Sequence, residues 1–125
     1  MSVKQPSEMS ALFGKLYNDR NKSALLDLYA PDAVFTFDGT AMARGKSEIE
    51  KAVAPFFDQP LKISIRCASC YEAGDTALVQ SDWTLTAPDG SVAGKGTSAE
   101  VLRRGADGLW RFILDDATFA SRAGR

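Results

Sequence analysis

Four long strand-like segments fill the chain after Pro60, and they leave few folds open to it. They span residues 61–72, 76–87, 91–104 and 109–120, and they are rich in β-branched and aromatic residues or alternate apolar with polar ones. Short turn sequences separate them, and turns of this kind connect antiparallel neighbours. The three turns are Ala73-Gly74-Asp75, Pro88-Asp89-Gly90 and Ala106-Asp107-Gly108.

The residues before Pro60 predict three helices and one short strand. The first helix follows Pro6, the second covers residues 23–30, and the third begins at the capping-box sequence of residues 47–50 and ends or kinks at Pro55. The short strand covers residues 33–37. Helices followed by a run of strands indicate an α+β fold, with three N-terminal helices packed on one face of a curved antiparallel sheet.

Length and charge bound the class of protein. With 125 residues, we expect a single domain over residues 1–125. Its net charge of −1 offers no electrostatic footprint for nucleic acid or an anionic membrane. The N-terminal residues lack the apolar stretch of a signal peptide. We therefore expect a soluble, cytoplasmic protein whose partner is a small molecule or another protein chain.

The sequence contains no histidine, which excludes serine–histidine and cysteine–histidine nucleophile pairs and most transition-metal sites. Cys67 and Cys70 alone are too few to form a structural zinc site. On an extended strand, residues three apart point to opposite faces, so we expect two reduced cysteines that do not pair. No metal and no other cofactor is expected.

Three short stretches carry a family resemblance: Tyr29–Ala33 (YAPDA), Arg44-Gly45, and Gly108–Arg111 (GLWR). With the order of the elements, they resemble the nuclear transport factor 2-like superfamily, and more closely its bacterial SnoaL-like and ketosteroid isomerase-like proteins. The resemblance implies a cone-shaped shell of helices and curved sheet around a mostly apolar pocket. The superfamily hosts isomerases, dehydratases, cyclases, hydrolases and binding modules, so the fold alone selects no activity.

The resemblance also implies where catalytic groups would lie. Ketosteroid isomerases use a carboxylate base and an oxyanion hole made of a tyrosine and a protonated aspartic acid. By resemblance, these positions fall on Phe37, Phe13 and Ala99, none of which has the required chemistry. Other relatives place histidines late in the last strand, where this chain has Leu114 and Asp116.

Strict alternation along the last strand places Trp110, Phe112, Leu114 and Asp116 on one face, which the resemblance makes the pocket face. Asp116 is then the candidate acid/base, because burial among aromatic residues favours the neutral carboxyl. The alternative is that Asp116 only bonds backbone N–H groups near the strand end. Asp115 is expected on the outer face.

Other candidates follow from similar patterns. Trp83 is expected to face the pocket and Asp82 to face outward. Tyr17 lies one helical turn after Phe13, and its hydroxyl either reaches the cavity or points to the surface while the ring packs inside. Asp38 either lines the rim or caps a turn. The candidate catalytic residues are therefore Asp116 and Tyr17, and the expected ligand-binding residues are Phe13, Phe37, Asp38, Trp83, Ala99, Trp110, Phe112 and Leu114.

Three functions remain open. The first is a pocket that binds a small apolar molecule, and the second is an isomerase, lyase or cyclase that uses Asp116 on a carbonyl or polyketide-like substrate. The third is an oligomerisation module resembling the association domain of calmodulin-dependent kinases, which would require a partner domain. We also expect a homodimer through the outer sheet face, because Leu78, Leu102 and Ile113 are assigned to it.

Overall fold

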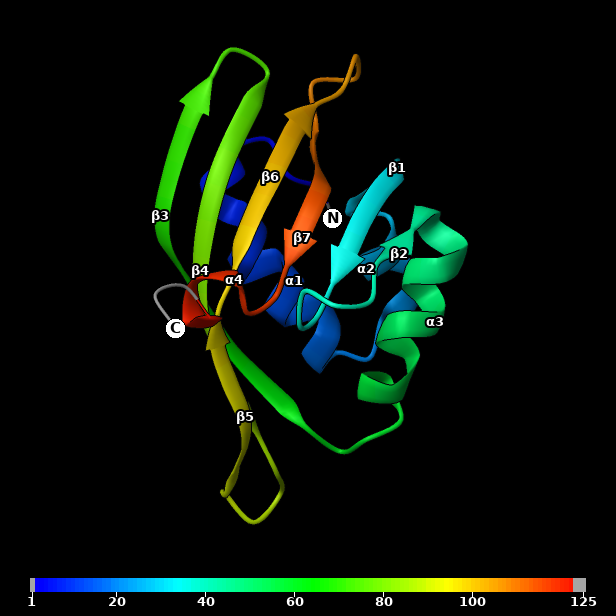
Figure 1. Cartoon of the computed structure of the whole chain (residues 1–125), viewed down its shortest axis with the longest axis vertical. Coiled ribbons are helices and arrows are strands. Elements are labelled where there is room, and N and C mark those ends of the chain that lie inside the picture. Colours follow the sequence, from blue (N-terminus) through cyan, green and yellow to red (C-terminus); the bar gives the residue numbers. More distant parts are fainter. Residues whose placement is uncertain (1, 123–125) are drawn as a thin grey trace.

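Within residues 2–122, which the computed structural model describes, seven strands form one curved sheet with helices on one of its faces (Figure 1). The strand order is β2-β1-β7-β6-β4-β3, and β5 pairs with β4. All pairs are antiparallel except β1 and β7, which run parallel. The strands are β1 (Tyr29–Thr36), β2 (Ala43–Arg44), β3 (Lys62–Ala73), β4 (Thr76–Thr86), β5 (Val92–Thr97), β6 (Ala99–Arg104) and β7 (Trp110–Asp116).

Helices α1 and α3 cover opposite ends of the inner sheet face, with α1 against β3 and α3 against β1. Gly14 permits the close approach of α1, because a Cβ atom there would lie 2.7 Å from the Ile65 side chain. The predicted α+β fold is confirmed. The helices are η1 (Pro6–Glu8, a 3-10 turn), α1 (Met9–Asn18), α2 (Lys22–Leu26), α3 (Gly45–Phe57) and α4 (Phe119–Arg122).

Two helix boundaries differ from the prediction. Tyr29 begins β1 rather than lying within the second helix, because it pairs with Phe112 of β7 and its ring packs on the Phe112 ring at 4.7 Å. The third helix begins two residues before Ser47. There the Glu48 carboxylate accepts a hydrogen bond from the backbone N–H of Arg44, so the predicted cap at Ser47 is wrong.

The segment predicted as one strand over residues 91–104 is two strands interrupted at Ser98. The Ser98 side-chain oxygen accepts the backbone N–H of Ser81 in place of a ladder carbonyl. The register with β4 continues across the interruption, since Asp82 pairs with Thr97 and Val79 pairs with Glu100. Glu100 therefore shares the inner face with the inward-facing residues of β4.

A β-bulge in β7 reverses the side-chain alternation near its end. Phe112 pairs with Leu102 of β6, but Leu114 pairs with the next residue, Val101, so Ile113 is one residue more than the partner strand provides. Such an extra residue breaks the period of two. Phe112 faces the core before the bulge and Asp115 faces it after the bulge, while Leu114 is 48% exposed.

A second bulge, at Ala68 in β3, changes the position of the cysteines. Cys67 pairs with Ser81 and Ser69 pairs with Gln80, so Ala68 is unmatched. Both cysteines are free thiols and both pack against the core. The expectation that their side chains point apart is therefore wrong, and burial raises the pKa of both thiols.

No helix within residues 2–122 is long and apolar enough to cross a bilayer.

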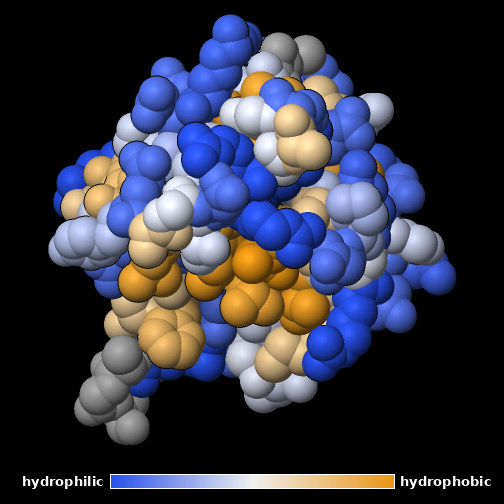
Figure 2. Space-filling model, turned by 90° about the horizontal axis from the view of Figure 1, so that it is seen from above, coloured by the Kyte–Doolittle hydropathy of each residue, from blue (hydrophilic) through white to orange (hydrophobic). Residues whose placement is uncertain are grey.

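The outer sheet face carries a row of apolar side chains across five strands. Figure 2 shows one end of the molecule rather than the sheet face, and apolar residues gather there among hydrophilic ones. Leu102, expected on the outer face, is fully buried inside, because the register with β4 turns it inward. The row consists of residues that are direct neighbours on adjacent strands: Tyr71, Leu78, Val101, Leu114 and Val34.

We propose that this row is the contact surface of a homodimer, because a two-fold axis sets one apolar row against its copy. Leu78→Lys should convert the dimer to a monomer at micromolar concentration, since it places a charge in the centre of the contact. Light scattering after size-exclusion chromatography measures the mass. Val92→Lys is the matched control, because Val92 is also exposed but lies on β5 outside the row. A monomeric parent protein would refute the proposal.

Candidate functional site

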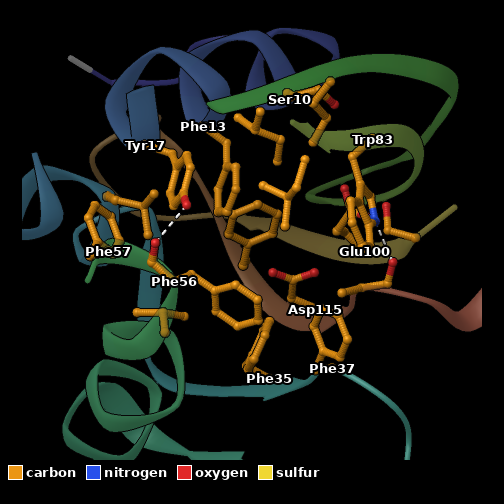
Figure 3. Close-up of a pocket in the computed structure, with 18 residues that line it drawn as sticks. Ser10, Phe13, Tyr17, Phe35, Phe37, Phe56, Phe57, Trp83, Glu100 and Asp115 are labelled. Atoms are coloured by element: carbon orange, nitrogen blue, oxygen red, sulfur yellow. Dashed lines mark hydrogen bonds between the residues drawn. The ribbon is translucent and has the colours of Figure 1, made fainter. Parts of the chain in front are cut away.

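A cavity of about 90 Å³ lies between the helices and the inner sheet face. Its wall is almost entirely apolar, and Figure 3 shows aromatic rings from both layers arranged around its centre. Two carboxyl groups interrupt this wall, Glu100 from β6 and Asp115 from β7. The aromatic residues of the lining are Phe13, Tyr17, Phe35, Phe37, Phe56, Phe57, Trp83 and Phe112.

Asp115 directs its carboxyl group into the space between the rings (Figure 3). Its side chain is buried, with 8% of the residue exposed. The Tyr29 hydroxyl donates a 2.5 Å hydrogen bond to Oδ2. Burial raises the pKa of Asp115 to about 7, although the Tyr29 hydrogen bond acts in the opposite direction. Burial likewise raises the pKa of Tyr29, which therefore stays a neutral donor.

Glu100 lies directly opposite Asp115 on the neighbouring strand and is 4% exposed. The Ser81 hydroxyl donates a hydrogen bond of 2.9 Å to its Oε1 atom. The other oxygen, Oε2, is buried without a hydrogen-bond partner among the described residues. Burial, and then the nearby charge of Asp115, raise the pKa of Glu100 to about 8.

A short chain of hydroxyl groups links Glu100 to the helix layer. Because the Ser81 hydroxyl donates to Glu100, it accepts from the Ser10 hydroxyl of α1 at 2.7 Å. Buried polar groups need such partners, since an unmatched donor costs about 1–3 kcal/mol. The chain orients one Glu100 oxygen and leaves the other unsatisfied.

Trp83 forms part of the wall as predicted, and its indole is held on both sides. The indole N–H donates to the Ala117 carbonyl oxygen at 2.7 Å (Figure 3). Gly96 lies opposite on β5, where a Cβ atom would approach the indole to 2.8 Å. Asp82 faces outward as predicted and pairs with Arg66. The Trp83 N–H therefore already has an acceptor within the protein.

Tyr17 also lines the cavity, but its hydroxyl is bonded within the protein. It donates to the backbone oxygen of Phe56 at 2.7 Å, a contact drawn in Figure 3. The ring contributes an apolar surface, and the hydroxyl ties α1 to α3. Of the expected ligand-binding residues, those that line the cavity are Phe13, Phe37, Trp83 and Phe112.

The predicted orientation of the two aspartates is wrong. Asp116 lies outside the cavity lining and forms an ion pair with Arg122, while Asp115 faces the cavity. Leu114 is likewise turned to the outer face rather than into the pocket. The cause is the bulge at Ile113, which shifts the alternation by one residue.

Three further expected pocket residues lie elsewhere. Ala99 is off the inner face because its neighbours, Ser98 and Glu100, occupy it. Asp38 is exposed and caps a turn by accepting from the Thr40 N–H and hydroxyl. Trp110 is buried outside the cavity, with the Arg104 guanidinium 5.5 Å from its ring.

Sequence reasoning missed both carboxyl groups of the site. For Glu100, the turn at residues 88–90 pairs Thr86 with Val92, a register that would set Ala99 opposite Val79. One extra residue in β5, Ala93, shifts the ladder, so that Val79 pairs with Glu100 instead and Glu100 faces the cavity. For Asp115, the bulge at Ile113 shifts the alternation in the same way, and nothing near Ile113 marks it.

The comparisons with known proteins agree with this architecture. The family model of the SnoaL-like domain matches residues 10–113. The chain belongs to the SnoaL-like family. No curated protein sequence matches it significantly.

Solved structures of similar fold share little sequence with this SnoaL-like chain. An NTF2-like protein with a cystatin-like fold from Novosphingobium aromaticivorans has a TM-score of 0.79 at 18% identity, covering 94% of this chain and 81% of its own. A ketosteroid isomerase-like protein from Erwinia carotovora atroseptica has a TM-score of 0.68 at 23% identity, with coverage of 88% and 90%. A protein from Catenulispora acidiphila in complex with S-DNPA has a TM-score of 0.68 at 20% identity, with coverage of 84% and 83%.

The raised pKa values predict how stability depends on pH. In the unfolded chain both carboxyls titrate near pH 4. In the folded chain the pKa of Asp115 is raised to about 7 and that of Glu100 to about 8. Their protonation therefore stabilises the fold fully below about pH 4, and this contribution is lost as the pH rises through about 8. The free energy of unfolding should fall between about pH 5 and about pH 8, as measured by urea denaturation.

Glu100→Gln should make that fall smaller, because it removes one of the two titrations. Glu72→Gln is the matched control, since Glu72 is exposed on β3 away from the cavity. A parent protein whose stability is constant or rises over this range would contradict the assignment of buried carboxyls.

Proposed function

We propose that the chain binds a small, largely apolar molecule with one polar group, held in the cavity beside Glu100 and Asp115. The observation that carries this proposal is the combination of an aromatic wall with two buried carboxyls, each with an oxygen that accepts no hydrogen bond from the described residues. Ligand pockets typically combine apolar walls with a few convergent polar groups. The S-DNPA complex of a protein with this fold is consistent with such a role.

The energetic cost of the carboxyl pair supports a role in binding. Replacing buried charged groups with apolar side chains of similar volume is often neutral or stabilising by about 1–4 kcal/mol. Glu100 and Asp115 lie among phenylalanines, where apolar residues would pack without penalty. Groups with strongly perturbed pKa values in a cavity are typical of functional sites.

Blocking the cavity should abolish ligand binding without unfolding the chain. Ala117→Leu extends a side chain into the cavity that Ala117 lines, so the affinity for a small aromatic probe such as benzyl alcohol should fall about tenfold or more. Isothermal titration and the fluorescence of Trp83 measure binding. Ala41→Leu, at an exposed turn, is the control and should bind as the parent does. Equal affinity of Ala117→Leu and the parent would place binding outside the cavity.

A second candidate function is acid/base catalysis of the isomerase or lyase type on a carbonyl substrate, with Asp115 in the role first assigned to Asp116. It is favoured by one specific observation, the raised pKa of Asp115 to about 7, which suits a group that exchanges a proton near neutral pH. Phe13 and Phe37 add no acid or base, so the two carboxyls would provide all the proton transfer.

Exchange of the α-hydrogens of a small aryl ketone, acetophenone, with solvent deuterium tests this candidate. NMR of the ketone should show a rate that rises as Asp115 ionises through pH about 7. Asp115→Asn should lower the enzyme-dependent rate by about a hundredfold or more, since it removes the base. Asp116→Asn should leave the rate unchanged, because Asp116 lies outside the cavity. Equal loss in both variants would exclude Asp115 as the base.

A further inference from the structure

The two carboxyls of the cavity have no basic partner. Among the described residues that line the cavity there is no lysine or arginine. The arginines nearest in the sequence are paired elsewhere, Arg103 with Asp32 and Arg111 with Asp107. Arg122 is paired with Asp116. A buried carboxylate without a counter charge is costly, and this is the physical reason that both pKa values are raised. Once one of the two carboxyls is ionised, the site therefore lacks a compensating positive charge.

The hydrogen-bond donors of the lining are all used within the protein. The Tyr17 hydroxyl donates to a backbone oxygen of Phe56, and the Trp83 indole donates to one of Ala117. The Ser10 hydroxyl donates to Ser81, and the Ser81 hydroxyl donates to Glu100. The Ser98 hydroxyl donates to the backbone oxygen of Ser81. The only donor that the lining offers to a ligand carbonyl or carboxylate is therefore the O–H group of a protonated Glu100 or Asp115. Free acceptors do exist, at Oε2 of Glu100 and Oδ1 of Asp115.

The aromatic wall is a third feature that favours a positively charged ligand. Figure 3 shows rings of Phe13, Phe35, Phe37 and Phe56 around the space into which Asp115 points. The face of an aromatic ring carries negative electrostatic potential and attracts a cation, by about 0.5–2 kcal/mol for each well-placed ring. An ammonium group placed against a ring face would add this attraction to that of an ionised carboxyl.

We infer that the cavity selects a small organic cation, a protonated amine on an apolar body, whose N–H groups donate to Glu100 and Asp115 while the body packs on the aromatic wall. This inference rests on the proposed function and specifies the ligand class. Glu100 and Asp115 are cross-strand neighbours that form no hydrogen bond with each other, so an ammonium group between them bridges two acceptors. The bound cation also supplies the charge that the site lacks.

Benzylammonium, its neutral isostere benzyl alcohol, and benzoate test the inference on the full chain. At pH about 8, near the raised pKa of Glu100, isothermal titration should show benzylammonium binding about tenfold or more tightly than benzyl alcohol. Benzoate should bind most weakly, because its charge repels the carboxyl pair.

Glu100→Gln should reduce the preference for benzylammonium over benzyl alcohol to about threefold or less, since it removes one charge and keeps the shape. Glu72→Gln, on the exposed part of β3, should keep the preference of the parent. Retained binding of benzyl alcohol by Glu100→Gln shows that the variant is folded and its cavity intact.

The outcomes separate the inference from the proposed function. If benzyl alcohol or benzoate binds as tightly as benzylammonium, the cation inference is wrong, while a small-molecule pocket stands. An unchanged preference in Glu100→Gln also overturns the inference. If none of the three compounds binds, the proposed function fails and the inference fails with it.

Discussion

The buried pair of Glu100 and Asp115 is the constraint around which the inner face is organised. Two carboxyls on adjacent strands repel each other when both are ionised, and burial weakens the screening that water would give. The chain compensates locally: the Tyr29 hydroxyl supports Asp115, and the Ser81 hydroxyl supports Glu100. These bonds leave part of the cost in place, because Oε2 of Glu100 is buried without a hydrogen-bond partner among the described residues.

A single extra residue in β7 brings Asp115 into this pair. The bulge at Ile113 turns Asp115 toward Glu100 and, by the same rotation, turns Leu114 to the outer face. Leu114 then continues the apolar row through Val101 and Leu78. The position of Asp115 in the cavity and the continuity of the apolar row on the outer face thus both depend on the bulge at Ile113. Bulges of this kind are common near functional sites.

The fold was predictable because its signals are local and repeated. The strand segments after Pro60 are long and bounded by glycine-containing turns, and the inward face of β4, including Trp83, follows from alternation that no bulge of that strand interrupts. The site was less predictable, because it depends on the register between β4 and β6 and on the bulge in β7. Alternation placed Asp116 in the pocket, since a bulge carries no reliable sequence mark. The family resemblance pointed to Ala99, one residue from Glu100, and a shift of one residue exchanges the faces of a strand.

The hydrogen-bond donors of the cavity already have acceptors within the protein, which distinguishes this pocket from an oxyanion hole. An oxyanion hole needs donors that are free and aimed at the ligand. Here the hydroxyl of Tyr17 and the indole of Trp83 serve as links between helices, strands and loops. What remains available to a ligand is acceptor capacity at two carboxyls within an aromatic enclosure. An acid in that setting acts on a ligand in only two ways: it donates its own proton when neutral, or it receives a cation when ionised. The absence of any basic group from the described lining favours the second, because the cation then supplies the charge compensation that the protein withholds.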